Sequence, residues 1–260
     1  MAGQAQGLQM PAKKAIDFAT VKVACRQCSV QQLCLPQGLD AADIERLDGL
    51  VRRPSPLRRG EYLFRQGDRF RSLYAIRSGS FKTHHLGEDG SERVLGFHLP
   101  GELLGLAGLG SGRYRASASA LDTAAVCALP FDRLQALAED LPSLNRQLYR
   151  ILSRRISGDQ EALLLLGDKS AQERLATFLL NLSQRFEQRG FSAREFNLSM
   201  SRQDIANYLG LTLETVSRTF SQFQKHGVLD VDRRLIRIVN RGHLTKAAGA
   251  CLTETSSATY

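Results

Sequence analysis

The chain has 260 residues, of which 43% are hydrophobic and 23% charged, and it carries a formal net charge of +9. That mixture is typical of a globular protein with about two domains, and it excludes a disordered chain or a fibre. The excess of positive charge favours anionic partners such as nucleic acids, although it is spread too evenly to locate a site. The start of the chain is polar and the longest aliphatic run, residues 162–166, is far shorter than a membrane span, so we expect a cytoplasmic protein that does not bind a membrane.

The first notable feature along the chain is a group of three cysteines, Cys25, Cys28 and Cys34, which follows a segment without periodicity. We predict a mobile arm over residues 1–24. In a cytoplasmic chain such cysteines indicate reduced thiols or metal thiolates rather than disulfides. The spacing C-x2-C-x5-C plus one distant cysteine can supply the four thiolates of an iron–sulfur cluster, and a structural zinc site is equally compatible with it. The spacing alone leaves both sites open.

In the middle of the chain, the pattern of apolar residues changes from one typical of helices to one typical of strands. Residues 39–51 have apolar side chains at helical spacing, and Asp40 is placed to cap that helix. From residue 56 to residue 130, short apolar runs alternate with glycine turns, which predicts an antiparallel barrel or sandwich. The last of these strands, residues 124–129, carries Cys127. We therefore predict a sensor domain over residues 25–141.

A long helix is predicted over residues 142–167, because apolar residues form one stripe along it. This apolar stripe consists of Leu148, Leu152, Ile156 and Leu163, and Asp159 lies within it. The stripe could pack on the helix's own barrel or form a two-helix dimer seam, and the near-heptad spacing favours the seam. A second helix is predicted over residues 172–189, ending at Gly190.

The C-terminal part predicts a winged helix-turn-helix over residues 168–245, followed by a tail over residues 246–260. Ser201 and Asp204 fit a capping box, Gly210 supplies a sharp turn, and Thr212 can cap the next helix. Two apolar runs, residues 228–231 and 235–239, flank a turn and predict the hairpin that forms the wing.

The outer face of the second of these two helices carries Glu214, Ser217 and Arg218, which we call the reading trio. Arginine can bind guanine through two hydrogen bonds, glutamate can accept from cytosine, and serine can serve either base. The alternative is a solvated face with an ion pair between Glu214 and Arg218. Taken together with the wing, the trio predicts DNA binding.

The order of barrel, long helix and winged helix-turn-helix resembles the cyclic-AMP receptor superfamily of bacterial transcription regulators, and within it the fumarate and nitrate reduction regulator (FNR) family. The segments that carry the resemblance are residues 25–29 (CRQCS), 34–36 (CLP), 73–79 (LYAIRSG), 96–101 (GFHLPG) and 214–218 (ETVSR). The fold class that the resemblance implies is α+β: an N-terminal antiparallel β-roll like a cyclic-nucleotide-binding domain, a long dimerisation helix and a C-terminal winged helix-turn-helix.

The resemblance also implies a function. It implies an oxygen-labile [4Fe-4S] cluster on Cys25, Cys28, Cys34 and Cys127, and a homodimer while the cluster is present. It further implies binding to a palindrome resembling TTGAT-N4-ATCAA, with Glu214, Ser217 and Arg218 at base-reading positions. RNA polymerase is the implied partner in activating or repressing genes of anaerobic metabolism.

Other functions are compatible with parts of the sequence. The segment Gly101-Glu102-Leu103, with Arg113 downstream, partly resembles a cyclic-nucleotide phosphate cassette, but its spacing is longer, and we interpret it as a vestige. The alternative function is a regulator of the same superfamily gated by a cyclic nucleotide or containing structural zinc. We expect no enzyme, because the sequence has no set of nucleophile, base and orienting residue. Cys251 lies in a polar tail, and we expect it to be a bystander.

Overall fold

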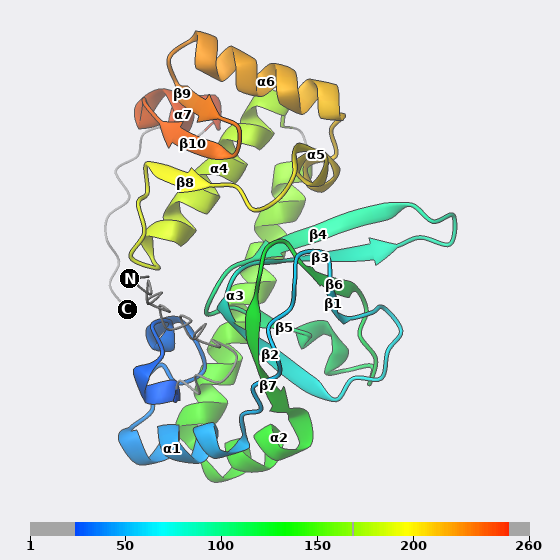
Figure 1. The fold of residues 1–260 in the computed structure, drawn as a ribbon, viewed down its shortest axis with the longest axis vertical. Coiled ribbons are helices and arrows are strands. Elements are labelled where there is room, and N and C mark those ends of the chain that lie inside the picture. Colours follow the sequence, from blue (N-terminus) through cyan, green and yellow to red (C-terminus); the bar gives the residue numbers. More distant parts are fainter. Residues whose placement is uncertain (1–23, 168, 250–260) are drawn as a thin grey trace, which may run out of the picture.

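Residues 24–167 and 169–249 are described by the computed structural model (Figure 1). Nearly all of the predicted N-terminal arm, and the tail from residue 250 with Cys251, lie outside these ranges. The fold is α+β, as predicted: a β-roll, one long helix and a helical domain with a small sheet follow one another along the chain. No helix among the described residues is long and apolar enough to cross a membrane.

The N-terminal segment precedes the β-roll and forms two short 3-10 helices, η2 (Cys25–Gln27) and η3 (Gln31–Leu33), and then helix α1 (Ala41–Leu50). Asp40 caps α1 as predicted, since its carboxylate accepts a hydrogen bond of 2.8 Å from the amide of Asp43. The buried face of α1, Ile44 and Leu47, holds it in place. The helix predicted over residues 39–51 is therefore present, and two 3-10 helices that were not predicted precede it.

The β-roll consists of two antiparallel sheets. One sheet has the strand order β1-β6-β3-β4 and the other β5-β2-β7. The strands are β1 (Tyr62–Phe64), β2 (Ser72–Ser78), β3 (Phe81–Leu86), β4 (Glu92–His98), β5 (Leu103–Leu104), β6 (Ser117–Ala120) and β7 (Ala125–Pro130), with the 3-10 helix η4 (Leu106–Gly108) after β5. Their interior is filled by aromatic rings, of which Phe64 and Tyr114 stack with centroids 3.9 Å apart.

Helix α2 (Phe131–Asp140) follows β7 and leads into the long helix α3 (Pro142–Leu166). Sequence analysis missed α2. Pro142 occupies the first turn of α3, where its missing N–H costs no hydrogen bond. The helix ends at Gly167, as predicted. In Figure 1, α3 runs along the molecule from α1 and α2 to the C-terminal helices.

The C-terminal domain contains four helices and a three-stranded sheet within the described residues. These elements are α4 (Ala171–Glu187), β8 (Glu195–Asn197), α5 (Arg202–Leu209), α6 (Leu213–Lys225), β9 (Leu229–Asp232), β10 (Leu235–Ile238) and α7 (Arg241–Ala247). The hairpin β9-β10 is the predicted wing, and β8 adds a third strand to it. Helix α7 extends past residue 245, and its buried Leu244 belongs to the core.

One hydrophobic core is shared between the β-roll and the C-terminal domain. Val94, Phe97 and Leu99 from the end of β4 pack in the same cluster as the inner faces of α4, α5 and α6. A continuous apolar contact of this kind fixes the relative orientation of two domains better than a polar one does. The C-terminal domain is therefore held against strand β4.

Candidate metal centre and nucleic-acid interface

The structure places Cys25, Cys28, Cys34 and Cys127 around one small pocket, although Cys127 is far from the others in sequence. All four are free and half-buried. Strand β7 supplies Cys127, which lies opposite Ala75 of β2 in the sheet. The other three come from the N-terminal segment that covers this end of the β-roll. The rest of the lining is mainly apolar, with two arginines: Val30, Gln31, Leu35, Pro36, Leu47, Val51, Arg53, Ala75, Ile76, Arg77 and Leu129.

The surroundings of Cys25, Cys34 and Cys127 oppose ionisation of these three thiols. Burial raises the pKa of Cys34 to about 12, and burial also raises the pKa of Cys127. Burial, and then a hydrogen bond with Asp48, raises the pKa of Cys25. Thiolates in such a place need a metal cation to compensate their charge. Four thiols match, in number and type, the ligand set of an iron–sulfur cluster and also that of a structural zinc ion.

Within residues 24–167 and 169–249, no group of three or more His, Cys, Asp or Glu side chains is arranged to hold one metal ion.

The cysteine loop, residues 25–37, is held against the rest of the protein by several contacts, two of which involve Gly101 and Gln147. Gly101, with a φ of +91°, lies so close to η3 that a Cβ atom there would be 2.8 Å from Cβ of Leu33. On the other side, the Gln147 amide of α3 donates to the carbonyl of Cys34 at 3.3 Å and to the Gln37 side chain at 3.2 Å. Gln147 is 1% exposed. The position of Cys34 is thus connected directly to the long helix.

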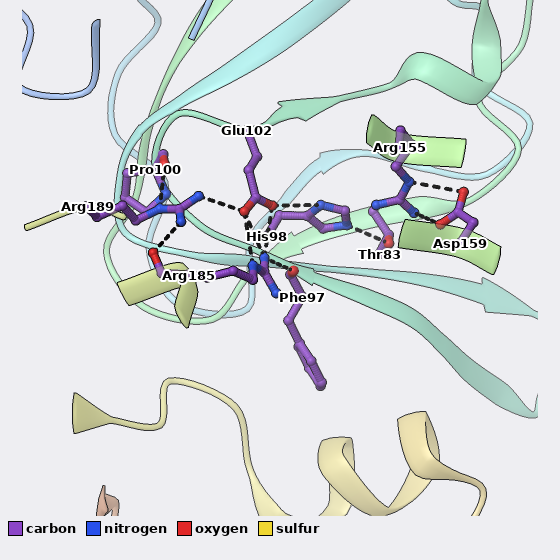
Figure 2. A network of polar contacts seen from close by, with 9 residues as sticks. All are labelled: Thr83, Phe97, His98, Pro100, Glu102, Arg155, Asp159, Arg185 and Arg189. Atoms are coloured by element: carbon purple, nitrogen blue, oxygen red, sulfur yellow. Dashed lines mark hydrogen bonds and ion pairs between the residues drawn. The ribbon is translucent and has the colours of Figure 1, made fainter. Parts of the chain in front are cut away.

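The Glu102 carboxylate, in the segment that resembles a phosphate cassette, is engaged by the protein itself (Figure 2). The Arg185 guanidinium of α4 lies 2.9 Å from both Glu102 oxygens, and that of Arg189 lies 2.7 Å from one of them. His98 is buried beside this group, and burial, with Arg155 and Arg185 nearby, holds its pKa well below the usual value. The Glu102 carboxylate is therefore already paired within the protein, and the vestigial cassette stays a prediction.

The helix-turn-helix has the local structure that its sequence predicts. Ser201 and Asp204 form the capping box, with a hydrogen bond of 3.0 Å from the Asp204 amide to the Ser201 hydroxyl. Gly210 takes a left-handed conformation with a φ of 64°, and Thr212 caps α6 by accepting from the Thr215 amide. The faces of α5 and α6 that meet are buried: Ile205, Ala206, Leu209, Val216, Phe220 and Phe223.

The reading trio lies on the outer face of α6 near its N-terminal end. Glu214, Ser217 and Arg218 are all exposed. No ion pair joins Glu214 to Arg218 in this part of the structure, so the side chains are not engaged with each other. The N-terminal part of such a helix is the part that enters a major groove.

The apolar stripe of α3 is divided between two environments. Leu148 and Leu152 are half-buried, and Leu148 packs against the core cluster that contains Leu35. Further along, Ile156 is 59% exposed and Leu163 is 72% exposed. The first part of the stripe therefore packs on the protein's own core, as one sequence alternative proposed, and the second part is available to another surface. Asp159 is exposed and pairs with Arg155 at 3.1 Å.

Sequence analysis missed the residues that attach the C-terminal domain to the β-roll. Besides Arg185 and Arg189, these are Lys82, which is ion-paired with Asp204 of α5 at 2.8 Å, and Asn207, whose side chain accepts from the Val94 amide at 2.7 Å. Their partners are distant in sequence, and no local pattern marks them.

Comparison with known proteins agrees with this architecture. Residues 54–140 match the cyclic nucleotide-binding domain family, and residues 173–247 match the Crp-like helix-turn-helix domain family. The chain is 50% identical over 228 residues to the transcriptional activator protein anr of Pseudomonas aeruginosa, covering 88% of this chain and 93% of that protein. It is 48% identical over 227 residues to the fumarate and nitrate reduction regulatory protein of Escherichia coli (strain K12), covering 87% and 91%.

Among solved structures, FixK2 from Bradyrhizobium japonicum has a TM-score of 0.70 at 32% identity, covering 77% of this chain and 98% of that chain. The relatives are transcription regulators rather than enzymes. Both matched domains, and the identity across most of the chain, lead to one assignment: this chain belongs to the FNR family of DNA-binding transcription regulators, within the cyclic-AMP receptor superfamily.

Proposed function

We propose that this regulator senses oxygen through a [4Fe-4S] cluster held by Cys25, Cys28, Cys34 and Cys127, and that it binds a palindromic FNR-type site as a homodimer while the cluster is intact. The observation that carries the proposal is the pocket in which the four free thiols meet. When bound there, such a cluster supplies an oxygen-reactive centre with thiolate ligands. The names of the relatives, which include a fumarate and nitrate reduction regulator, support the same function.

The chain's own contacts supply a route from the pocket to the dimer helix. Cys34 is held between the core of the β-roll and α3, and Gln147 binds its carbonyl from the first half of that helix. When the cysteine loop moves away from this position, Gln147 loses its hydrogen bonds to Cys34 and Gln37. The first half of α3 then also loses its apolar contacts with Leu35. The same helix continues to the exposed Ile156 and Leu163, where a second copy would pack. Ligand occupancy at the pocket can thereby shift the monomer and dimer populations.

A homodimer would place two copies of α6 on the two halves of a palindrome resembling TTGAT-N4-ATCAA. The reading trio would contact base edges, and the turn between β9 and β10, with Arg233 and Arg234, would lie near the phosphates. RNA polymerase is then the partner through which the bound dimer acts on genes of anaerobic metabolism.

The test of the sensing function is spectroscopic. Anaerobically purified protein should contain about four iron and four sulfide ions per chain and absorb visible light, and air should remove both properties together with DNA binding. A colourless protein that contains one zinc ion per chain and binds DNA equally well in air would contradict the proposal. Binding that requires an added cyclic nucleotide would contradict it as well.

We predict that Arg218→Ala relaxes specificity at the guanine of the half-site and weakens binding to the cognate palindrome by about 1 to 3 kcal/mol. The side chain is exposed beside Glu214 on the outer face of α6, where its guanidinium is free to bind a base. Titrations at one fixed salt concentration on cognate and scrambled DNA measure the effect. Equal losses on both sequences would make Arg218 a phosphate contact instead.

A further inference from the structure

Strand β4 lies at the edge of its sheet, where one row of backbone groups has no neighbouring strand. Helix α5 of the C-terminal domain covers that edge. The Asn207 side chain hydrogen-bonds there to the β4 backbone, as a neighbouring strand would. Its oxygen accepts from the Val94 amide at 2.7 Å, and its nitrogen donates to the Glu92 carbonyl. A carboxamide has the same donor and acceptor as a peptide group, so it can pair with both. The first helix of the DNA-binding unit is thus hydrogen-bonded to the β-roll backbone.

An ion pair strengthens the same contact. Lys82 of β3 lies between two carboxylates, 2.6 Å from Glu92 on the roll and 2.8 Å from Asp204 on α5. The side chains of Lys82 and Asp204 are only 17% and 15% exposed, so solvent screens their attraction little. Without the ammonium group, the two carboxylates would face each other across the domain boundary and repel.

Further contacts beside this pair restrict rotation of the domain. Tyr208, the neighbour of Asn207, packs edge-on against Phe97 of β4 with ring centroids 5.3 Å apart. At the same residue of β4, Arg185 of α4 donates to the Phe97 carbonyl at 2.7 Å, in addition to its pair with Glu102 (Figure 2). These contacts lie on separate helices of the C-terminal domain, α5 and α4, so the domain is held at more than one point.

We propose that Asn207 and Lys82 are positioning residues that set the distance between half-sites which the dimer accepts. This inference rests on the proposed function, because it requires a dimer on a palindrome. Leu165 of α3 lies in the same core cluster as Phe97 of β4 and the inner faces of α5 and α6, so the position of α6 relative to α3 depends on how α5 docks on β4. Because α3 would form the dimer seam, the docking of α5 determines where the two reading trios lie. One added base pair moves a half-site by about 3.4 Å and turns it by about 34°. A dimer whose two DNA-binding domains are rigidly docked on their β-rolls should lose affinity when the spacing changes. A dimer with loosely docked domains should lose less.

The experiment compares anaerobic, cluster-loaded full-length protein on palindromes with the preferred spacer and with spacers one base pair shorter or longer. The variants are Asn207→Ala and Lys82→Met. The matched control is Asn197→Ala, which removes an exposed asparagine on β8 of the same domain. In Lys82→Met the Val94 amide keeps its acceptor on Asn207, so its hydrogen exchange reports undocking without any DNA; in Asn207→Ala, exchange at the other amides of β4 reports it.

Wild-type protein and the control should bind the altered spacers about tenfold more weakly than the preferred one. In both test variants this ratio should fall to about threefold or less, with faster exchange at β4. The inference would be overturned if the variants lost affinity equally at all three spacers. It would also be overturned if a variant with faster exchange at β4 kept the wild-type ratio between the preferred and the altered spacers. Unchanged exchange in both variants would overturn it as well, because the contact would then not hold the domain. A wild type that binds none of the palindromes would instead contradict the proposed function, and the inference with it.

Discussion

Replacing Cys127 by serine is expected to abolish anaerobic DNA binding as severely as Cys28→Ser, while Cys251→Ser leaves binding intact. Of the four pocket cysteines, Cys127 alone lies on a strand of the β-roll, and the others belong to one short segment. A serine hydroxyl is a poor substitute for a soft thiolate ligand, so one iron would lack its protein ligand. Affinity should fall to the non-specific level, a loss of about three orders of magnitude or more.

The measurements are iron and sulfide content and DNA titration, all under anaerobic conditions. Because serine is close to cysteine in size, the β-roll should keep its fold, and circular dichroism of the variant provides that control. A Cys127→Ser protein with full iron, sulfide and DNA affinity would remove Cys127 from the ligand set.

The second large effect is expected from Asp159→Ala, which should yield a dimer that binds DNA in air without the cluster. Asp159 lies on α3 between the exposed residues Ile156 and Leu163, so a twofold seam would bring two copies of its carboxylate close together. Like charges in a partly desolvated interface oppose association. The pair with Arg155 is exposed and offsets this repulsion only in part, because such pairs contribute about 0.3 to 0.5 kcal/mol. Removing both carboxylates should tighten the dimer about tenfold or more.

Sedimentation of the air-exposed variant measures whether it is a monomer or a dimer without the cluster. A clean monomer at concentrations where the anaerobic wild type is dimeric would mean that Asp159 does not govern the switch. Glu161→Ala is the matched control, since Glu161 is an exposed acid on the same helix about 140° around its axis from Ile156. That control should dissociate in air like the wild type.

The parts of the fold that the sequence predicted are those with local signatures. The Ser201 capping box, the Gly210 turn and the long apolar period of α3 each follow from residues close together in the chain, and the structure contains all three. Helix α2 and strand β8 were missed because α2 follows a strand directly at Pro130 and β8 is only three residues long. Strand β8 is too short to show a period. The apolar residues Leu134, Leu137 and Ala138 of α2 do recur at helical spacing, but no loop separates this helix from β7.

The candidate site was predictable to a similar extent. Residue type and spacing drew attention to the cysteines and to the reading trio, but not to Gln147 or Asn207, whose roles depend on backbone groups of distant segments. A glutamine or asparagine looks the same in sequence whether it is solvated or bound to a carbonyl of another element. Glu102 was noticed for its resemblance to a cassette, and its actual partners, Arg185 and Arg189, became visible only when α4 was placed against the β-roll.

The position of Cys127 has a further consequence for stability. A metal centre bound by all four thiols would join the N-terminal segment to strand β7 and close a long loop of the chain. Such a cross-link lowers the entropy of the unfolded chain, and ligand binding to the folded form alone adds to the free energy of unfolding. The part of the N-terminal segment that carries the three cysteines has few buried apolar residues, chiefly Val30 and Leu35, and none within η2 or η3. Its resistance to proteolysis should therefore follow the occupancy of the pocket, and the segment should be cleaved first once the metal centre is lost.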